Sequence, residues 1–161
     1  MVAAGGDFGE RDRVQIRDAS DGYVPTPEDA PFHRMGKEDG IRALVKTFYD
    51  TMEQTEPALT RTHALDRDGH IPDAFRNRFG MFLIGWLGGP QEYIERYGHP
   101  RLRARHNAVR VDEAMRDAWL RCMKAALDAH GVSGGVRTYL DQRFAEVADF
   151  LRNVPPASPT K

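Results

Sequence analysis

Apolar residues recur every three to four positions along most of the chain, which is the spacing of one face of an α-helix. This spacing predicts long helices around 41–52, from 72 or 73 to 87, over 113–130 and over about 135–153, and a short helix over 91–98. Asp112 suits the N-cap of the third long helix, and Gly88, Gly89 and Pro90 suit the end of the second. Strand-like alternation and internal repeats are absent from the sequence. We therefore predict an all-α fold of five or six helices.

The chain of 161 residues fits one domain with additional segments at its ends. Residues 1–30 are rich in Gly, Asp, Arg and Pro without a sustained period, so we expect a flexible N-terminal extension. Residues 31–153 form the predicted globular domain. Residues 154–161, which include three prolines, are the predicted disordered C-terminal tail.

Composition narrows the function classes. The formal net charge of -1 does not favour nucleic acid as a partner, although RLRARH is a basic stretch. Cys122 is the single cysteine, which excludes a disulfide within the chain and a metal site built from several cysteines. The sequence contains neither a signal peptide nor the roughly 20 apolar residues of a membrane helix, so we expect a cytoplasmic protein.

Candidate chemistry concentrates in residues 97–106, where His99 and His106 stand among arginines. A histidine at a helix end, beside arginines and below an apolar pocket, suits a haem: a neutral imidazole binds the iron and guanidinium groups pair with the propionates. Suitable apolar walls are Phe79, Phe82, Trp86 and Trp119. Taken alone, the same residues also fit a solvated basic helix with an incidental histidine.

Longer motifs carry a family resemblance. The stretch FLIGWLGGPQEYIERYGHPRLRARH, the later RDAWLRCM and the upstream Phe48-Tyr49-Asp50 stand in this order along the chain. In these motifs the chain resembles the group II truncated haemoglobins over about residues 32–153. The resemblance implies a shortened globin, with a two-over-two helical sandwich around haem b and its iron.

The resemblance also implies roles for individual residues. His106 matches the proximal iron ligand, Tyr49 and Trp119 match distal hydrogen-bond donors, and His63 matches a polar residue beyond the helix of Tyr49. Such donors stabilise the partial negative charge of bound O₂. Phe75 and Phe79 fall at distal positions that are usually small or aliphatic, where their rings either narrow the path of a gas or simply pack in the core. The haem-binding positions implied by the match are Arg78, Phe79, Phe82, Trp86, Tyr93, His99, Leu102, Arg105, Val111 and Met123, with Arg78 and Arg105 at the propionates.

Three functions remain open at this point. The first is reversible binding, storage, transport or sensing of O₂, NO or CO at the haem. The second is an enzyme that turns over NO with O₂, or reduces peroxide, with electrons from an external reductase, since 161 residues leave no room for a reductase module. The third is a haem-free, globin-like regulator in which Phe75 and Phe79 fill the pocket. The oligomeric state is also left open.

Overall fold

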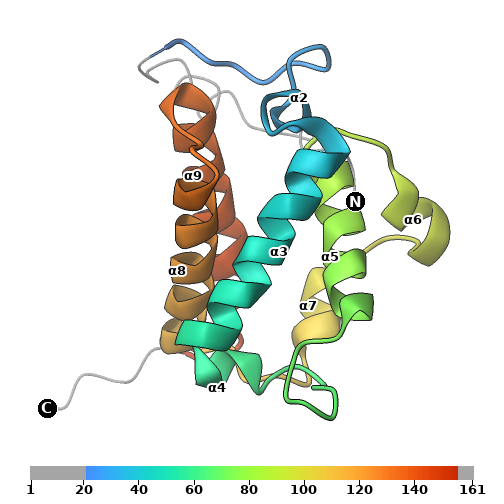
Figure 1. Ribbon diagram of the computed structural model, residues 1–161, viewed down its shortest axis with the longest axis vertical. Coiled ribbons are helices and arrows are strands. Elements are labelled where there is room, and N and C mark those ends of the chain that lie inside the picture. The colour runs from blue at the N-terminus through green and yellow to red at the C-terminus, as the bar shows by residue number, and fades with distance from the viewer. Residues whose placement is uncertain (1–20, 156–161) are drawn as a thin grey trace, which may run out of the picture.

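Four long helices in two antiparallel pairs make up most of the fold. A computed structural model describes residues 21–155 of the protein. One pair is α3 (Lys37–Thr55) with α5 (Asp73–Trp86), and the other is α8 (Glu113–Ala129) with α9 (Gly134–Phe150), as Figure 1 shows. Helix α3 also packs against α8 and so joins the two pairs. The described residues include no strand, and the predicted all-α, two-over-two arrangement is confirmed.

Four short helices connect and flank the long ones. They are α2 (Pro31–Arg34), α4 (Pro57–Thr60), α6 (Glu92–Tyr97) and α7 (Leu102–His106). The spacing analysis predicted α6 but not α2 and α4, because a single turn is too short to show a period. Both α2 and α4 have a proline in their first turn, where the missing N–H costs no hydrogen bond.

The predicted helix ends are observed. The side chain of Asp112 accepts a hydrogen bond from the backbone N–H of Met115 at 2.9 Å and caps α8. Gly88 follows α5 with φ of +99°, a conformation that glycine adopts without strain. A Cβ atom at Gly88 would collide with Ala30, so the turn after α5 also lies close to the segment before α2.

The core lies between α3, α5, α8 and α9. Its side chains are at most 1% exposed at Ile41, Leu44, Phe48, Met52, Leu83, Leu87, Cys122, Met123, Ala126, Leu127 and Leu140. These residues repeat at helical spacing in the sequence, which is why the periodicity alone located most of the core. Among residues 21–155, no helix is long and apolar enough to cross a membrane.

Part of the expected N-terminal extension contacts the domain. The ring of Tyr23 is 3% exposed and lies edge-on to Tyr139 of α9, with 6.1 Å between ring centroids. The carboxylate of Asp21 accepts a hydrogen bond from the N–H of Gly135, in the first turn of α9, at 2.8 Å. Residues 21–30 therefore belong to the folded structure, whereas residues 1–20 and 156–161 lie outside the described residues.

Candidate haem site

A continuous series of rings, here called the aromatic band, runs from α6 across α5 to α3, α8 and the segment after α4. The band consists of Tyr97, Tyr93, Phe82, Phe79, Trp119, Tyr49, His63 and Phe75. Consecutive ring centroids are 5.1 Å (Tyr93–Tyr97), 5.7 Å (Phe82–Tyr93) and 6.3 Å (Phe79–Phe82) apart on the α6 side. Except for Tyr97, every member was predicted from the sequence as a site residue.

The aromatic band is less buried than the core to which it is attached. Phe79, Phe82 and Trp119 are half-buried and pack against core residues. At the two ends of the band, Phe75 is 37% exposed and Tyr97 is 40% exposed. A half-buried surface of this kind suits a flat, apolar ligand that completes the packing.

Tyr49 and Trp119 bring hydrogen-bond donors to the band. The ring of Phe79 contacts both, with centroids 5.8 Å from Tyr49 and 6.4 Å from Trp119. Burial raises the pKa of Tyr49 well above its ordinary value, so its phenol stays protonated and can donate. Among residues 21–155, none accepts a hydrogen bond from the Tyr49 hydroxyl or from the Trp119 indole N–H. Both donors are therefore available to a ligand.

His106 lies at the C-terminal end of α7, and one of its ring nitrogens is engaged. Its Nδ1 atom is 2.6 Å from the carbonyl oxygen of Leu102, one turn earlier. Because a carbonyl only accepts, Nδ1 must carry the hydrogen, which leaves the lone pair on Nε2 in the neutral ring. A backbone acceptor at Nδ1 is the usual way in which a metal-binding histidine is oriented.

His63 faces the same region from the segment after α4. Its Nδ1 atom lies 3.2 Å from the carbonyl oxygen of Leu59 and 3.3 Å from that of Thr60, so Nδ1 carries the hydrogen here as well. Burial lowers the pKa of His63, and the nearby charge of His106 lowers it further. At neutral pH, Nε2 of His63 is thus an acceptor, although the family match suggested a donor at this position.

Arginines lie at the α6 end of the band. The guanidinium of Arg78 is 5.0 Å from the ring centroid of Tyr97, and that of Arg105 is 5.7 Å from the centroid of Tyr93. Arg105 also donates from Nε to the carbonyl of Pro100 at 2.7 Å. An open hollow of about 500 Å³ adjoins them and is lined by Tyr97, Gly98, His99, Arg101, Ala104 and Arg105. The cations predicted for the propionates thus share one rim of the site.

Four further predicted haem-binding residues are not members of the aromatic band. Trp86 is 5% exposed and stacks on Phe144 at 5.3 Å, and Met123 is 1% exposed, so both belong to the core. Val111 is buried at the start of α8. Leu102 is half-buried and takes part through its backbone carbonyl, which binds His106.

Sequence reasoning missed three residues that shape the site. Phe48 is fully buried behind the band and contacts Phe79 and Trp119, with centroids 5.4 and 5.2 Å away. Tyr97 follows Tyr93 by one helical turn, a spacing that would have linked the two rings. Arg76 interrupts the apolar stripe of α5, and its guanidinium lies 5.5 Å from the ring centroid of Tyr49.

Comparison with known proteins identifies the class. The model of the bacterial-like globin family matches residues 30–153. The chain belongs to this family, and its relatives place it with the group II truncated haemoglobins. It is 36% identical over 125 residues to the group 2 truncated hemoglobin YjbI of Bacillus subtilis. The aligned region covers 78% of this chain and 89% of the relative.

Solved structures agree in fold. A cold-adapted truncated hemoglobin from the Antarctic marine bacterium Pseudoalteromonas haloplanktis superposes with a TM-score of 0.71 at 36% identity, covering 78% of this chain and 99% of that one. The truncated oxygen-avid haemoglobin of Bacillus subtilis superposes with a TM-score of 0.67 at 35% identity, and the match covers 77% of this chain and 99% of that one.

The globin family implies a haem cofactor, and the residues present fit one. A porphyrin supplies four nitrogens to its iron and needs a protein ligand only on its axis. His106 offers a neutral imidazole nitrogen, the aromatic band offers a half-buried apolar surface, and Arg78 and Arg105 offer positive charge at one rim.

Proposed function

We propose that this protein binds O₂, or another diatomic gas, at the iron of a haem b that His106 would hold. The observation that carries the proposal is the hydrogen bond between Nδ1 of His106 and the Leu102 carbonyl, which leaves the lone pair of the neutral ring on Nε2. The oxygen-avid relative from Bacillus subtilis supports O₂ as the gas. When bound, the haem supplies a ferrous iron that coordinates the gas.

The chain's own residues would act by holding the cofactor and polarising the gas. Tyr49 and Trp119 would donate hydrogen bonds to the gas, and such donors stabilise negative charge on it. Because the two donors are ordered by ring contacts with Phe79 and Phe48, they need little reorganisation when a gas arrives. His63, whose ring lies edge-on to Tyr49 with 5.9 Å between centroids, would help to hold the Tyr49 ring in place.

The contacts of Phe75 and Phe79 support a role for both rings as walls of the site. Phe79 packs on the buried ring of Phe48, with 5.4 Å between centroids, which suits a wall residue. Phe75 is 37% exposed and lies edge-on to His63, at the outer end of the band. The two rings would therefore narrow the path to the iron without replacing the haem.

The test is the absorption spectrum of the purified protein, oxidised and reduced, before and after addition of haem and CO. The wild type should take up one haem per chain and show a Soret band that shifts with CO. His106→Ala should lose this Soret band or release haem far more readily, and added imidazole should restore the band. A His99→Ala variant is the matched control. An unchanged spectrum in His106→Ala would overturn the axial assignment, and a wild type that takes up no haem would overturn the function.

A further inference from the structure

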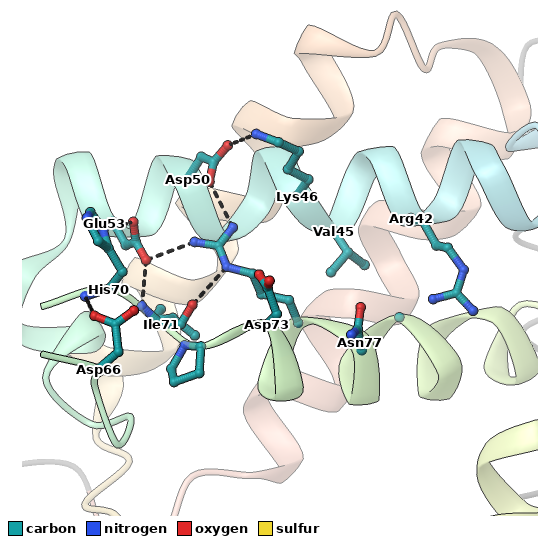
Figure 2. A pocket seen from close by; sticks show the side chains of 13 residues that line it. Arg42, Val45, Lys46, Asp50, Glu53, Asp66, His70, Ile71, Asp73 and Asn77 are labelled. Atoms are coloured by element: carbon teal, nitrogen blue, oxygen red, sulfur yellow. Dashed lines mark hydrogen bonds and ion pairs between the residues drawn. The ribbon is translucent and has the colours of Figure 1, made fainter. Parts of the chain in front are cut away.

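A polar cluster joins α3, α5 and the segment before α5 on the side of Tyr49. At its centre, the guanidinium of Arg76 donates from Nη1 to Asp50 and from Nη2 to Glu53, both at 2.8 Å, and from Nε to the carbonyl of Ile71 at 3.0 Å. Figure 2 shows these three bonds beside an open hollow of about 620 Å³. The side chain of Arg76 is 15% exposed, so solvent screens this cluster less than a surface ion pair.

The cluster fixes both backbone groups of Ile71. Its carbonyl accepts from Arg76, and its N–H donates to Oε1 of Glu53 at 2.6 Å. His70 adds a third link through Nδ1, which is 3.1 Å from Oε2 of Glu53. The segment that carries His63 therefore ends at a point tied to both long helices of the first pair.

The same guanidinium touches the distal tyrosine. It lies 5.5 Å from the ring centroid of Tyr49, the residue before Asp50 on α3. On its other side, the Tyr49 ring lies edge-on to His63, with 5.9 Å between centroids. One side chain thus contacts the Tyr49 ring and also anchors the segment that brings His63 to that ring.

We propose that Arg76 is a positioning residue for the gas site, which fixes the Tyr49 ring and the His63 segment in one arrangement. The inference rests on the proposed function. Its physical basis is that a forked guanidinium with three acceptors from two chain segments restricts both, and that hydrogen-bond donors act best when held in place beforehand. A salt bridge that only stabilised the fold would have no effect on a gas at the iron.

The chain provides a matched control in Arg137 of α9. Its side chain is 14% exposed and pairs with Asp128 at 2.9 Å and Asp141 at 2.8 Å. It also donates to the carbonyl of Val132 at 3.0 Å. Arg137 therefore matches Arg76 in burial, in its two carboxylates and in its backbone acceptor, but it joins α9 to α8.

The experiment compares Arg76→Met, Arg76→Lys and Arg137→Met in two measurements. In the protein as purified, amide hydrogen exchange of residues 61–71 should accelerate about tenfold in Arg76→Met and not in Arg137→Met. In the CO-saturated ferrous protein, the C–O stretching band, which reports donors near the gas, should shift or split in Arg76→Met only. Arg76→Lys keeps the charge but not the forked guanidinium, so its exchange rate and its C–O band should lie between those of the wild type and Arg76→Met. If Arg76→Met does not fold, Arg76→Lys takes its place in both measurements.

Each outcome decides the matter. Faster exchange with an unchanged C–O band would reduce Arg76 to a structural ion pair and overturn the proposal. The same band shift in Arg137→Met, or no change in either measurement, would overturn it too. Failure of the proposed function is seen separately, because the unmodified protein would then take up no haem.

Discussion

The core and the aromatic band are built from the same kinds of side chain, yet they differ in how completely the protein covers them. Leu127 and Leu140 are 0% exposed, whereas Phe75 at the end of the band is 37% exposed. The core is closed mainly by the four long helices, and Tyr23, Phe32, Leu59 and Ile71 add to it from the connecting segments. The band ends in the exposed rings of Phe75 and Tyr97, and the proposed haem would complete its packing. Stability and function are thereby assigned to neighbouring surfaces of the same helices.

Truncation of a core residue is the strongest way to test this difference. Leu127→Ala should lower the free energy of unfolding by about 2–5 kcal/mol, with or without haem, because it leaves a cavity in a closed region. Phe82→Ala removes a larger side chain that is only half-buried, so without haem its loss should be smaller. Urea unfolding of both variants, with and without haem, measures the loss in the free energy of unfolding. Equal losses in the haem-free proteins would contradict the distinction.

Removal of the Tyr49 hydroxyl should change gas binding strongly and the stability of the fold only slightly. Tyr49→Phe keeps the ring contacts with Phe79 and His63 but removes the donor, so O₂ should dissociate about tenfold faster or more. Stopped-flow displacement of O₂ by CO measures the rate, with Tyr139→Phe as the control in α9. If the rate is unchanged, Tyr49 does not contact the gas.

The smallest expected effect is a change with pH in the exchange protection of residues 61–71, the segment that contains His70. Glu53 raises the pKa of His70 by a hydrogen bond and by its charge, and Asp66 and Asp68 add to this. A raised pKa contributes stability that is fully present below the ordinary value of 6.5 and is lost as pH rises through the folded value. The ratio of the protection of residues 61–71 at pH 6 to that at pH 8 should therefore be about two- to threefold larger in the wild type than in His70→Gln, a modest factor because His70 is exposed.

The matched variant for this effect is His70→Gln, in which the protection of residues 61–71, corrected for intrinsic exchange, should lose the part of its pH response that comes from His70. The lowered pKa of His63 acts in the opposite direction in both proteins, because it contributes stability that is lost as pH falls. Helix α8 has an apolar inner face and should not respond in either protein. A pH response that survives in His70→Gln would have to come from another group. Glu53 is not that group, because hydrogen bonds from Ile71, His70 and Arg76 outweigh the effect of burial and lower its pKa, so it stays ionised at both pH values.

Features that depend on local spacing were predictable, and features that depend on distant pairing were not. The long helices, the Asp112 cap and the turn at Gly88 follow from short stretches of sequence. The motifs around His106 also identified most of the aromatic band. By contrast, the bonds of Arg76 join residues 26 and 23 positions apart, and only the folded chain brings them together.

The His63 nitrogen shows the same limit at the level of a single atom. The family match placed a polar residue at this position, but its hydrogen-bonding role depends on which nitrogen meets the carbonyls of Leu59 and Thr60. That choice is made by the local backbone, and the residue type alone does not reveal it.

The contact between Asp21 and Gly135 bears on how far the protein can be shortened. Ser133, at the start of α9, makes no capping bond with its own side chain, and the N–H of Gly135 is satisfied from a carboxylate 114 positions earlier. The family match begins at residue 30. A fragment cut there would lose both this cap and the Tyr23 ring that packs on Tyr139. The shortest fragment that retains the native start of α9 therefore begins at or before Asp21.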